Sequence, residues 1–179
     1  MSVPIYIAFG ANLGDPRESF RQAIVQLEQS GVTLIAMSGL WESPSWPPGM
    51  EAPNYINACA RVEFNGTARE LLLRLHRIEA ALGRKRSVSN APRTLDLDLI
   101  DFRGQCINAA DIQIPHPRMM NRGFVLFPLA QIAPDWRHPE SRVKIDSAIS
   151  KLPLCDVAAM EYLGRWDYDG FKKKRGKIT

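Results

Sequence analysis

The chain has 179 residues, of which 45% are hydrophobic and 23% charged, an ordinary composition for one compact globular domain. Its three cysteines form no C-x-x-C pair, which argues against a disulfide framework or a zinc site and indicates a reducing compartment. The sequence has neither a basic, apolar leader nor an apolar run of about 18 residues, so we expect a soluble, cytoplasmic protein. Five positive charges lie within 172–177, so the net charge of +4 leaves −1 for the rest, which disfavours binding of nucleic acid or membrane by the body of the protein.

The first forty residues carry signals for a strand, a helix and a second strand. An apolar run over 5–11 predicts a buried strand. Asp15 as N-cap, followed by Pro16, marks the start of a helix, and Gly31 marks its end. A second strand is expected over 32–41. The helix would bury an apolar stripe formed by Phe20, Ala23, Ile24 and Leu27.

A proline-rich segment over 42–53 predicts a loop that is long enough to have a function. Trp46 within it could cover a ligand or fold back on the core, and the sequence does not decide between these. The next strand, over 55–64, has an apolar face of even-numbered residues. Tyr55 and Asn57 would lie together on its other face, where a ring and an amide can stack on and hydrogen-bond a flat heterocycle. Solvent exposure explains the same pattern equally well.

A second helix begins at a capping box formed by Thr67 and Glu70, and Gly83 ends it. Glu79 lies near its C-terminal end, where the helix dipole disfavours an anion, which predicts a cationic partner. His76 and Glu79 share a face at a spacing that can bind metal, although a polar flank is the favoured interpretation. The expected buried stripe consists of Leu71, Leu75, Ile78 and Leu82.

A basic loop over 83–93 leads into a strand that carries two aspartates on one face. The alternation over 95–99 places leucines on one side and Asp96, Asp98 and Ile100 on the other. Residues i and i+2 of a strand lie roughly 6.5 to 7 Å apart, so both carboxylates can converge on one or two cations. Mg²⁺ suits such oxygen ligands, and the cations of the loop would complement a polyphosphate. For the D-x-D pattern alone, a solvated strand face is the bland alternative.

The remainder of the chain carries weaker signals. His116 and Arg122 flank a proline-restricted stretch, and we find no Ser or Cys nucleophile paired with a base, hence no signature of covalent catalysis. Apolar spacing predicts one more helix over 145–152. We therefore expect one domain over 1–163 and a basic, flexible tail over 164–179.

Three stretches, in this order, resemble the 6-hydroxymethyl-7,8-dihydropterin pyrophosphokinase family: YIAFGANLGD over 6–15, PRTLDLD over 92–98, and IPHPRMMNRGF over 114–124. D-x-D alone is a weak signal, but the three together are highly specific. The resemblance implies a ferredoxin-like α+β domain, with a mainly antiparallel sheet and helices packed on it. It also implies a monomeric enzyme of folate biosynthesis that uses two Mg²⁺ ions. The enzyme would transfer the β,γ-diphosphate of ATP to the hydroxymethyl oxygen of 6-hydroxymethyl-7,8-dihydropterin and release AMP.

The resemblance also implies roles for individual residues. Asp96 and Asp98 would bind both Mg²⁺ ions and, with Arg84 and Arg93, would form the catalytic group. Asn90 and Ala91 stand where family members often have Trp-Gly, which predicts that the basic loop lacks a closing aromatic. Residues expected to bind or support ATP are Glu79, Arg84, Arg86, Arg93, Ile100, His116 and Arg122. Residues expected to hold the pterin, between two aromatic rings and under a closing loop, are Ser43, Pro44, Trp46, Tyr55, Asn57 and Phe124.

Two other functions are weighed against this one. A nucleotide-binding module of the same fold without transfer is disfavoured because both aspartates, Arg93, Tyr55 and Asn57 are present. An RNA- or membrane-associating protein driven by its basic tail is disfavoured because the body of the chain has a net charge of −1.

Overall fold

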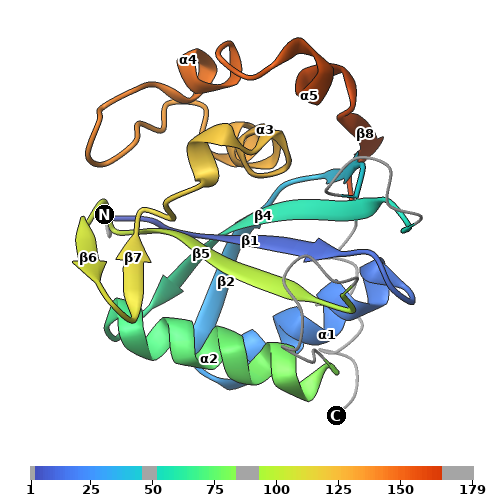
Figure 1. Cartoon of the computed structure of the whole chain (residues 1–179). Coiled ribbons are helices and arrows are strands. Elements are labelled where there is room, and N and C mark those ends of the chain that lie inside the picture. Colours follow the sequence, from blue (N-terminus) through green and yellow to red (C-terminus); the bar gives the residue numbers. More distant parts are fainter. Residues whose placement is uncertain (1–2, 46–51, 84–92, 167–179) are drawn as a thin grey trace.

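The protein is built on a six-stranded antiparallel sheet, seen in a computed structural model that describes residues 3–45, 52–83 and 93–166 (Figure 1). The strand order is β5-β1-β4-β3-β8, and β2 also pairs with β4. Two further short strands form a separate hairpin. The strands are β1 (Ile5–Ala11), β2 (Val32–Met37), β3 (Leu40–Ser43), β4 (Tyr55–Phe64), β5 (Asp96–Phe102), β6 (Ile107–Ala109), β7 (Ile112–Ile114) and β8 (Glu161–Gly164).

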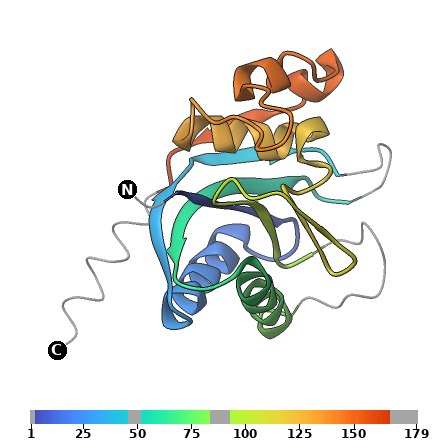
Figure 2. The same cartoon turned by 90° about the vertical axis from the view of Figure 1, so that its left-hand side faces the viewer.

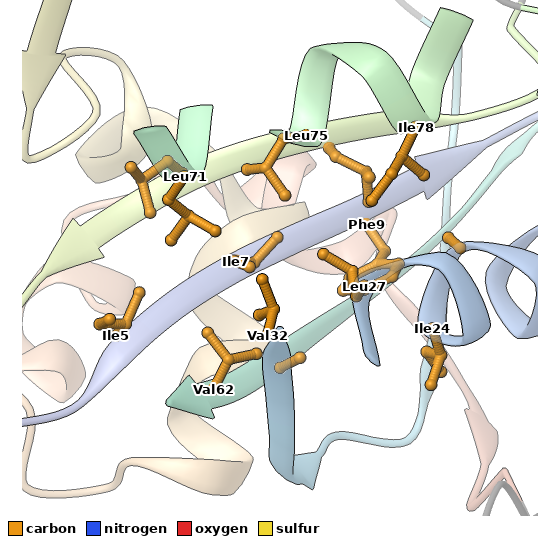
Figure 3. Close-up of a cluster of buried hydrophobic side chains, with 14 of the residues drawn as sticks. Ile5, Ile7, Phe9, Ile24, Leu27, Val32, Val62, Leu71, Leu75 and Ile78 are labelled. Carbon is orange, nitrogen blue, oxygen red and sulfur yellow. The ribbon is translucent and has the colours of Figure 1, made fainter. Parts of the chain in front are cut away.

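Helices α1 (Pro16–Gln29) and α2 (Ala68–Ala81) cover one face of the sheet (Figure 1). Both begin as predicted: the Asp15 carboxylate accepts the first free N–H groups of α1, and Thr67 and Glu70 form a capping box on α2. The main core lies between these helices and the sheet, as Figure 3 shows. Its labelled members are Ile5, Ile7, Phe9, Ile24, Leu27, Val32, Val62, Leu71, Leu75 and Ile78.

A second layer covers the opposite face of the sheet (Figure 2). It consists of α3 (Gly123–Ile132), α4 (Ile145–Ile149) and α5 (Leu154–Ala158), preceded by a short 3₁₀ turn over Met119–Asn121. Helix α3 packs on β4 and β3, so residues of β4 that point away from the main core are also buried. This second core includes Tyr6, Ala8, Cys59, Ile100, Val125, Leu126, Leu129 and Trp136. The antiparallel sheet with helices packed on both faces confirms the predicted ferredoxin-like α+β class.

The prediction of a single strand over 32–41 is wrong. The structure has two strands in this region, β2 and β3, which are separated by a break at Ser38 and Gly39. The Ser38 N–H donates to the Cys59 carbonyl at 2.9 Å, and the Ser38 hydroxyl accepts from the Cys59 N–H at 2.9 Å. Both β2 and β3 therefore pair with β4 on either side of this break. A side chain at Gly39 would place its Cβ 2.5 Å from the Tyr162 ring, so only glycine fits this crossing.

The C-terminal segment continues to pack beyond residue 163. Strand β8 runs to Gly164 and pairs with β3, and the Trp166 ring lies 6.0 Å from the Phe20 ring on α1. Arg21 lies over the same indole at 5.8 Å. The basic stretch of the expected tail, 167–179, lies outside the described residues. Among the helices that are described, none is long and apolar enough to cross a bilayer.

Candidate active site

Strands β4, β1 and β5 bring residues of both predicted subsites to one point above Gly10. Gly10 is paired with Asn57 on β4 and with Asp96 on β5, and paired residues of neighbouring strands share a face. A Cβ placed on Gly10 would lie 3.6 Å from Asn57 Oδ1, 3.8 Å from Asp96 Cβ and 4.0 Å from Tyr55 Cδ1. The lack of a side chain at Gly10 thus leaves the predicted pterin residues and a predicted metal ligand facing the same small space.

The two aspartates of β5 lie on the polar side of a strand whose leucines are buried. Asp96 and Asp98 have side chains 21% and 32% exposed, and Leu97 between them is 1% exposed in the main core. The alternation predicted over 95–99 is therefore confirmed. Both side chains are thus partly exposed, although Asp96 Oδ1 itself is buried, and the neighbouring leucines are packed in the core.

Ile100 follows a register shift, since Ile7 pairs with Leu99 and Tyr6 pairs with Asp101. The side chain of Ile100 is fully buried in the second core, and its carbonyl accepts the N–H of His116 at 3.0 Å. Any contact that Ile100 makes with a nucleotide is therefore expected to involve its backbone; its predicted role in ATP binding stays a prediction.

Cationic side chains meet each aspartate. Arg93 Nη1 lies 2.6 Å from Asp96 Oδ2, and Arg122 Nη1 lies 3.4 Å from Asp98 Oδ2. His116 Nε2 is 3.8 Å from the same oxygen of Asp98. The predicted metal ligands and three of the predicted nucleotide-binding residues thus form one cluster, in which each aspartate lies beside an arginine.

The imidazole of His116 is held in a defined tautomer. Its Nδ1 accepts the Arg118 N–H at 3.2 Å, so the proton of the neutral ring sits on Nε2, the nitrogen that faces Asp98. Burial lowers the pKa of His116, and the nearby charges of Arg122 and Arg118 lower it further, against the opposing effect of Asp98. His116 is therefore a neutral donor at pH 7, suited to an oxygen of a phosphate.

Glu79 supports the aspartate strand from α2. Its side chain is completely buried, and Oε1 accepts the N–H of Leu97 at 2.8 Å. Leu97 lies between the two aspartates, so this bond fixes the backbone from which both carboxylates project. The expected cationic partner of Glu79 stays a prediction, and the Leu97 N–H satisfies one of its buried carboxylate oxygens.

Asn57 is the centre of the predicted pterin side. It is 3% exposed, which contradicts solvent exposure as the reason for the polar face of β4. Its amide nitrogen donates to Ser43 Oγ at 2.9 Å, with the carbonyls of Trp41 and Tyr55 also within 3.3 Å. The donor end is thus anchored to β3, and the amide oxygen is left facing the space above Gly10.

The other predicted pterin residues surround or adjoin this group. Ser43 ends β3 and is buried, and Pro44 follows it directly. Phe124 lies in the first turn of α3, and the Arg122 guanidinium lies 5.3 Å from its ring, which links Phe124 to the Asp98 side. Trp46, Arg84 and Arg86 lie outside the described residues, so their predicted roles stay predictions.

Asn12 was not singled out from the sequence. It follows β1, is 5% exposed, and its side chain bonds to residues on both sides of the site: its amide donates to the Pro53 carbonyl at 3.1 Å and accepts the Arg93 N–H at 2.7 Å. These contacts join positions 41 and 81 residues away in the chain. No local signal in the sequence could have shown them.

The described residues fit a metal that arrives with a nucleotide. Within them, no group of three or more His, Cys, Asp or Glu side chains is placed to hold an ion, so Asp96 and Asp98 form a two-carboxylate site only. Mg²⁺ is typically bound by one or two carboxylates while phosphates and water complete its coordination, and the two carboxylates fit the protein's share of that donor set. A groove of about 560 Å³ between α1 and α2, lined by Leu73, Arg74 and Arg77 among others, lies on the opposite face of the sheet and holds none of the predicted site residues.

The chain is similar to known proteins in sequence and in fold. The family model for 7,8-dihydro-6-hydroxymethylpterin-pyrophosphokinase (HPPK) matches residues 6–134. A 2-amino-4-hydroxy-6-hydroxymethyldihydropteridine pyrophosphokinase from Pseudomonas aeruginosa is 39% identical over 77% of this chain and 85% of its own length. One from Bacillus subtilis is 40% identical over 71% of this chain and 76% of its own length. The crystal structure of an HPPK-DHPS in complex with substrates has a TM-score of 0.64 at 13% identity, over 82% of this chain and 42% of that longer chain, which shows a common fold.

Proposed function

This chain belongs to the 7,8-dihydro-6-hydroxymethylpterin-pyrophosphokinase family, and on that premise we propose that it transfers the β,γ-diphosphate of ATP to 6-hydroxymethyl-7,8-dihydropterin and releases AMP. Membership of the family makes it an enzyme of folate biosynthesis with pyrophosphokinase activity. The observation that best supports the full reaction is the space above Gly10. Atoms of Tyr55, Asn57 and Asp96 all lie within 4.0 Å of a Cβ placed on Gly10. An acceptor bound there would meet a nucleotide bound at the aspartates.

We propose that Tyr55, Asn57 and Phe124 bind a flat, hydrogen-bonding ring. The Tyr55 ring offers a stacking surface, and Phe124 is proposed as the second ring. Asn57 is buried and anchored through its amide nitrogen to Ser43, so its oxygen is presented in a fixed direction. A buried amide of this kind selects strongly for ligands that satisfy it, because a ligand without a donor would leave it unpaired.

The metal side is formed by Asp96 and Asp98, which we propose as the ligands of two Mg²⁺ ions carried by ATP. When bound, the ions would neutralise charge on the phosphate oxygens. Glu79 contributes indirectly, by fixing the strand at Leu97 so that both carboxylates keep their spacing.

The cations complete the nucleotide side. Three side chains already lie within 4 Å of an aspartate oxygen: Arg93, Arg122 and His116. Each could therefore reach a phosphate oxygen bound at the aspartates with a small side-chain movement. Arg93 and Arg122 present planar, permanently charged groups that match phosphate geometry, and neutral His116 donates from Nε2. Arg84 and Arg86 are proposed to act on the same phosphates.

Catalysis then depends on positioning and charge. The hydroxymethyl oxygen attacks the β-phosphorus of ATP, the bond from that phosphorus to the α,β-bridging oxygen breaks, and AMP leaves while the hydroxyl proton passes to solvent. Such transfers demand little covalent chemistry from the protein, and the gain comes from holding the reacting atoms in line and stabilising the migrating charge.

The test is AMP release from ATP and Mg²⁺ with and without 6-hydroxymethyl-7,8-dihydropterin. We expect AMP only when the pterin is present, together with one equivalent of pterin diphosphate. ATP binding without any pterin-dependent AMP would instead identify a binding module on this fold. Omission of Mg²⁺ in the presence of EDTA should abolish the reaction.

A further inference from the structure

Asn12 connects the two halves of the site through one carboxamide. Its Nδ2 donates to the Pro53 carbonyl at 3.1 Å, and its Oδ1 accepts the Arg93 N–H at 2.7 Å. Pro53 stands two residues before Tyr55 on the pterin side, and Arg93 stands three residues before Asp96 on the metal side. Both ends of the amide are therefore used, each on a different predicted subsite.

The backbone of Arg93 is held by more than one hydrogen bond from this segment. Besides the side-chain contact, the N–H groups of Asn12 and Leu13 both donate to the Arg93 carbonyl, at 3.0 and 3.1 Å. The backbone of Arg93 is thus held on both its N–H and its C=O, while its guanidinium reaches Asp96 at 2.6 Å. Asn12 is nearly buried at 5% exposure, so these bonds are shielded from competing water.

We propose that Asn12 is a positioning residue, which sets the distance between the pterin subsite and the Arg93–Asp96 pair and thereby aligns the two substrates. The inference rests on the proposed function above. Asn12 follows β1 directly, and β1 also carries Gly10, so the amide lies at the end of the strand that runs between the two subsites (Figure 1). A misplacement of about 1 Å between reacting groups can cost on the order of 100-fold in rate, so a connection of this kind affects turnover more than binding.

Only asparagine has the donor and the acceptor at this reach. Aspartate keeps an oxygen for the Arg93 N–H but places a second oxygen against the Pro53 carbonyl, so Asn12→Asp breaks the pterin-side bond alone. Alanine removes both bonds. The exposed Asn54 is a matched control, because its amide lies in the same segment and donates at 2.8 Å to Oε1 of Glu42, a residue outside both predicted subsites.

The experiment measures kcat and KM for AMP release, together with the Kd of α,β-methylene-ATP with Mg²⁺. We expect Asn12→Asp to lower kcat at least about 10-fold and to change that Kd less than about 3-fold, following the positioning argument. Asn54→Ala should keep kcat within about 2-fold of the wild type. A role that only supports the fold would move kcat, Kd and the melting temperature together.

A double-mutant cycle tests whether Asn12 acts through its contacts with Arg93. If Asn12 acts through Arg93, the fall in kcat for Asn12→Ala combined with Arg93→Ala should be at least about 5-fold smaller than the product of the separate falls. Multiplicative effects, or wild-type kcat in Asn12→Asp, would overturn the inference. Unfolding of both Asn12 variants would overturn it as well, because the residue would then serve the fold. Wild-type protein that forms no pterin-dependent AMP would reject the proposed function itself, a different and separate result.

Discussion

The substitution Gly10→Ala tests whether the two substrates meet above Gly10. The methyl group would lie 3.6 Å from Asn57 Oδ1 and 3.8 Å from Asp96 Cβ, which are ordinary van der Waals distances. Gly10 is not among the glycines with positive φ, so alanine can adopt its backbone conformation. Glycine within a strand costs about 0.5 to 1 kcal/mol relative to alanine, so the variant should fold at least as stably as the wild type.

The loss should therefore appear in catalysis. A methyl group in this space would push the acceptor away from the nucleotide by about 1 Å, and a displacement of this size can reduce the rate on the order of 100-fold. That fall corresponds to about 2.7 kcal/mol of transition-state stabilisation. The assay is kcat/KM for pterin-dependent AMP release, with urea unfolding and ATP binding measured on the same preparation.

A graded series sharpens the result. Gly10→Ser and Gly10→Val add volume at the same point, so kcat/KM should fall in the order of side-chain size while ATP binding changes much less. A Gly10→Ala variant that folds normally and keeps wild-type kcat/KM would show that neither substrate uses this space, and the proposed placement of the pterin would be wrong.

Three further predictions concern the aspartate strand. Asp96→Asn and Asp98→Asn should each lower kcat by about 1,000-fold or more with little change in melting temperature, because each removes a charged ligand but keeps its shape; near wild-type turnover in either would contradict the metal assignment. Glu79→Ala should lower the free energy of unfolding by about 1 to 3 kcal/mol, because a buried N–H loses its acceptor, whereas Glu79→Gln should recover most of it in urea titrations. Burial raises the pKa of Asp101 above its ordinary 3.8. Its contribution to stability is therefore complete below that value and is lost as the pH rises through the raised pKa. The urea midpoint of Asp101→Asn should therefore rise relative to that of the wild type as the pH rises from about 3. A difference between the two midpoints that does not change with pH would refute the raised pKa of Asp101.

The features that could be predicted from the sequence are those that depend on near neighbours. The capping box of Thr67 and Glu70 spans four residues, and the aspartate alternation over 95–99 spans five, so each pattern contains its own explanation. These two patterns were confirmed in the structure at the residues where they were expected. The paired aspartates were recognised in the same way, although their chemical role depends on partners that lie elsewhere in the chain.

The features that were missed depend on distant parts of the chain. Helix α3 is apolar except at Gln131 and contains Pro128, so its sequence shows no clear helical period, and its apolar residues pack on the sheet. The need for glycine at the break between β2 and β3 comes from Tyr162 on β8, which is more than 120 residues later in the chain. The bonds of Asn12 and the pairing of Arg122 with Asp98 likewise require the folded chain, since their partners are far apart in sequence.

The bond between Glu79 and Leu97 also supplies an acceptor to a backbone N–H on an edge strand. Strand β5 is at the edge of the sheet, where an unpaired backbone N–H can recruit the strand of another molecule. One carboxylate oxygen on α2 occupies the Leu97 N–H, in the place that a neighbouring strand would otherwise take. The strand that carries the two aspartates can therefore lie at the edge of the sheet without offering that N–H to the strand of another molecule.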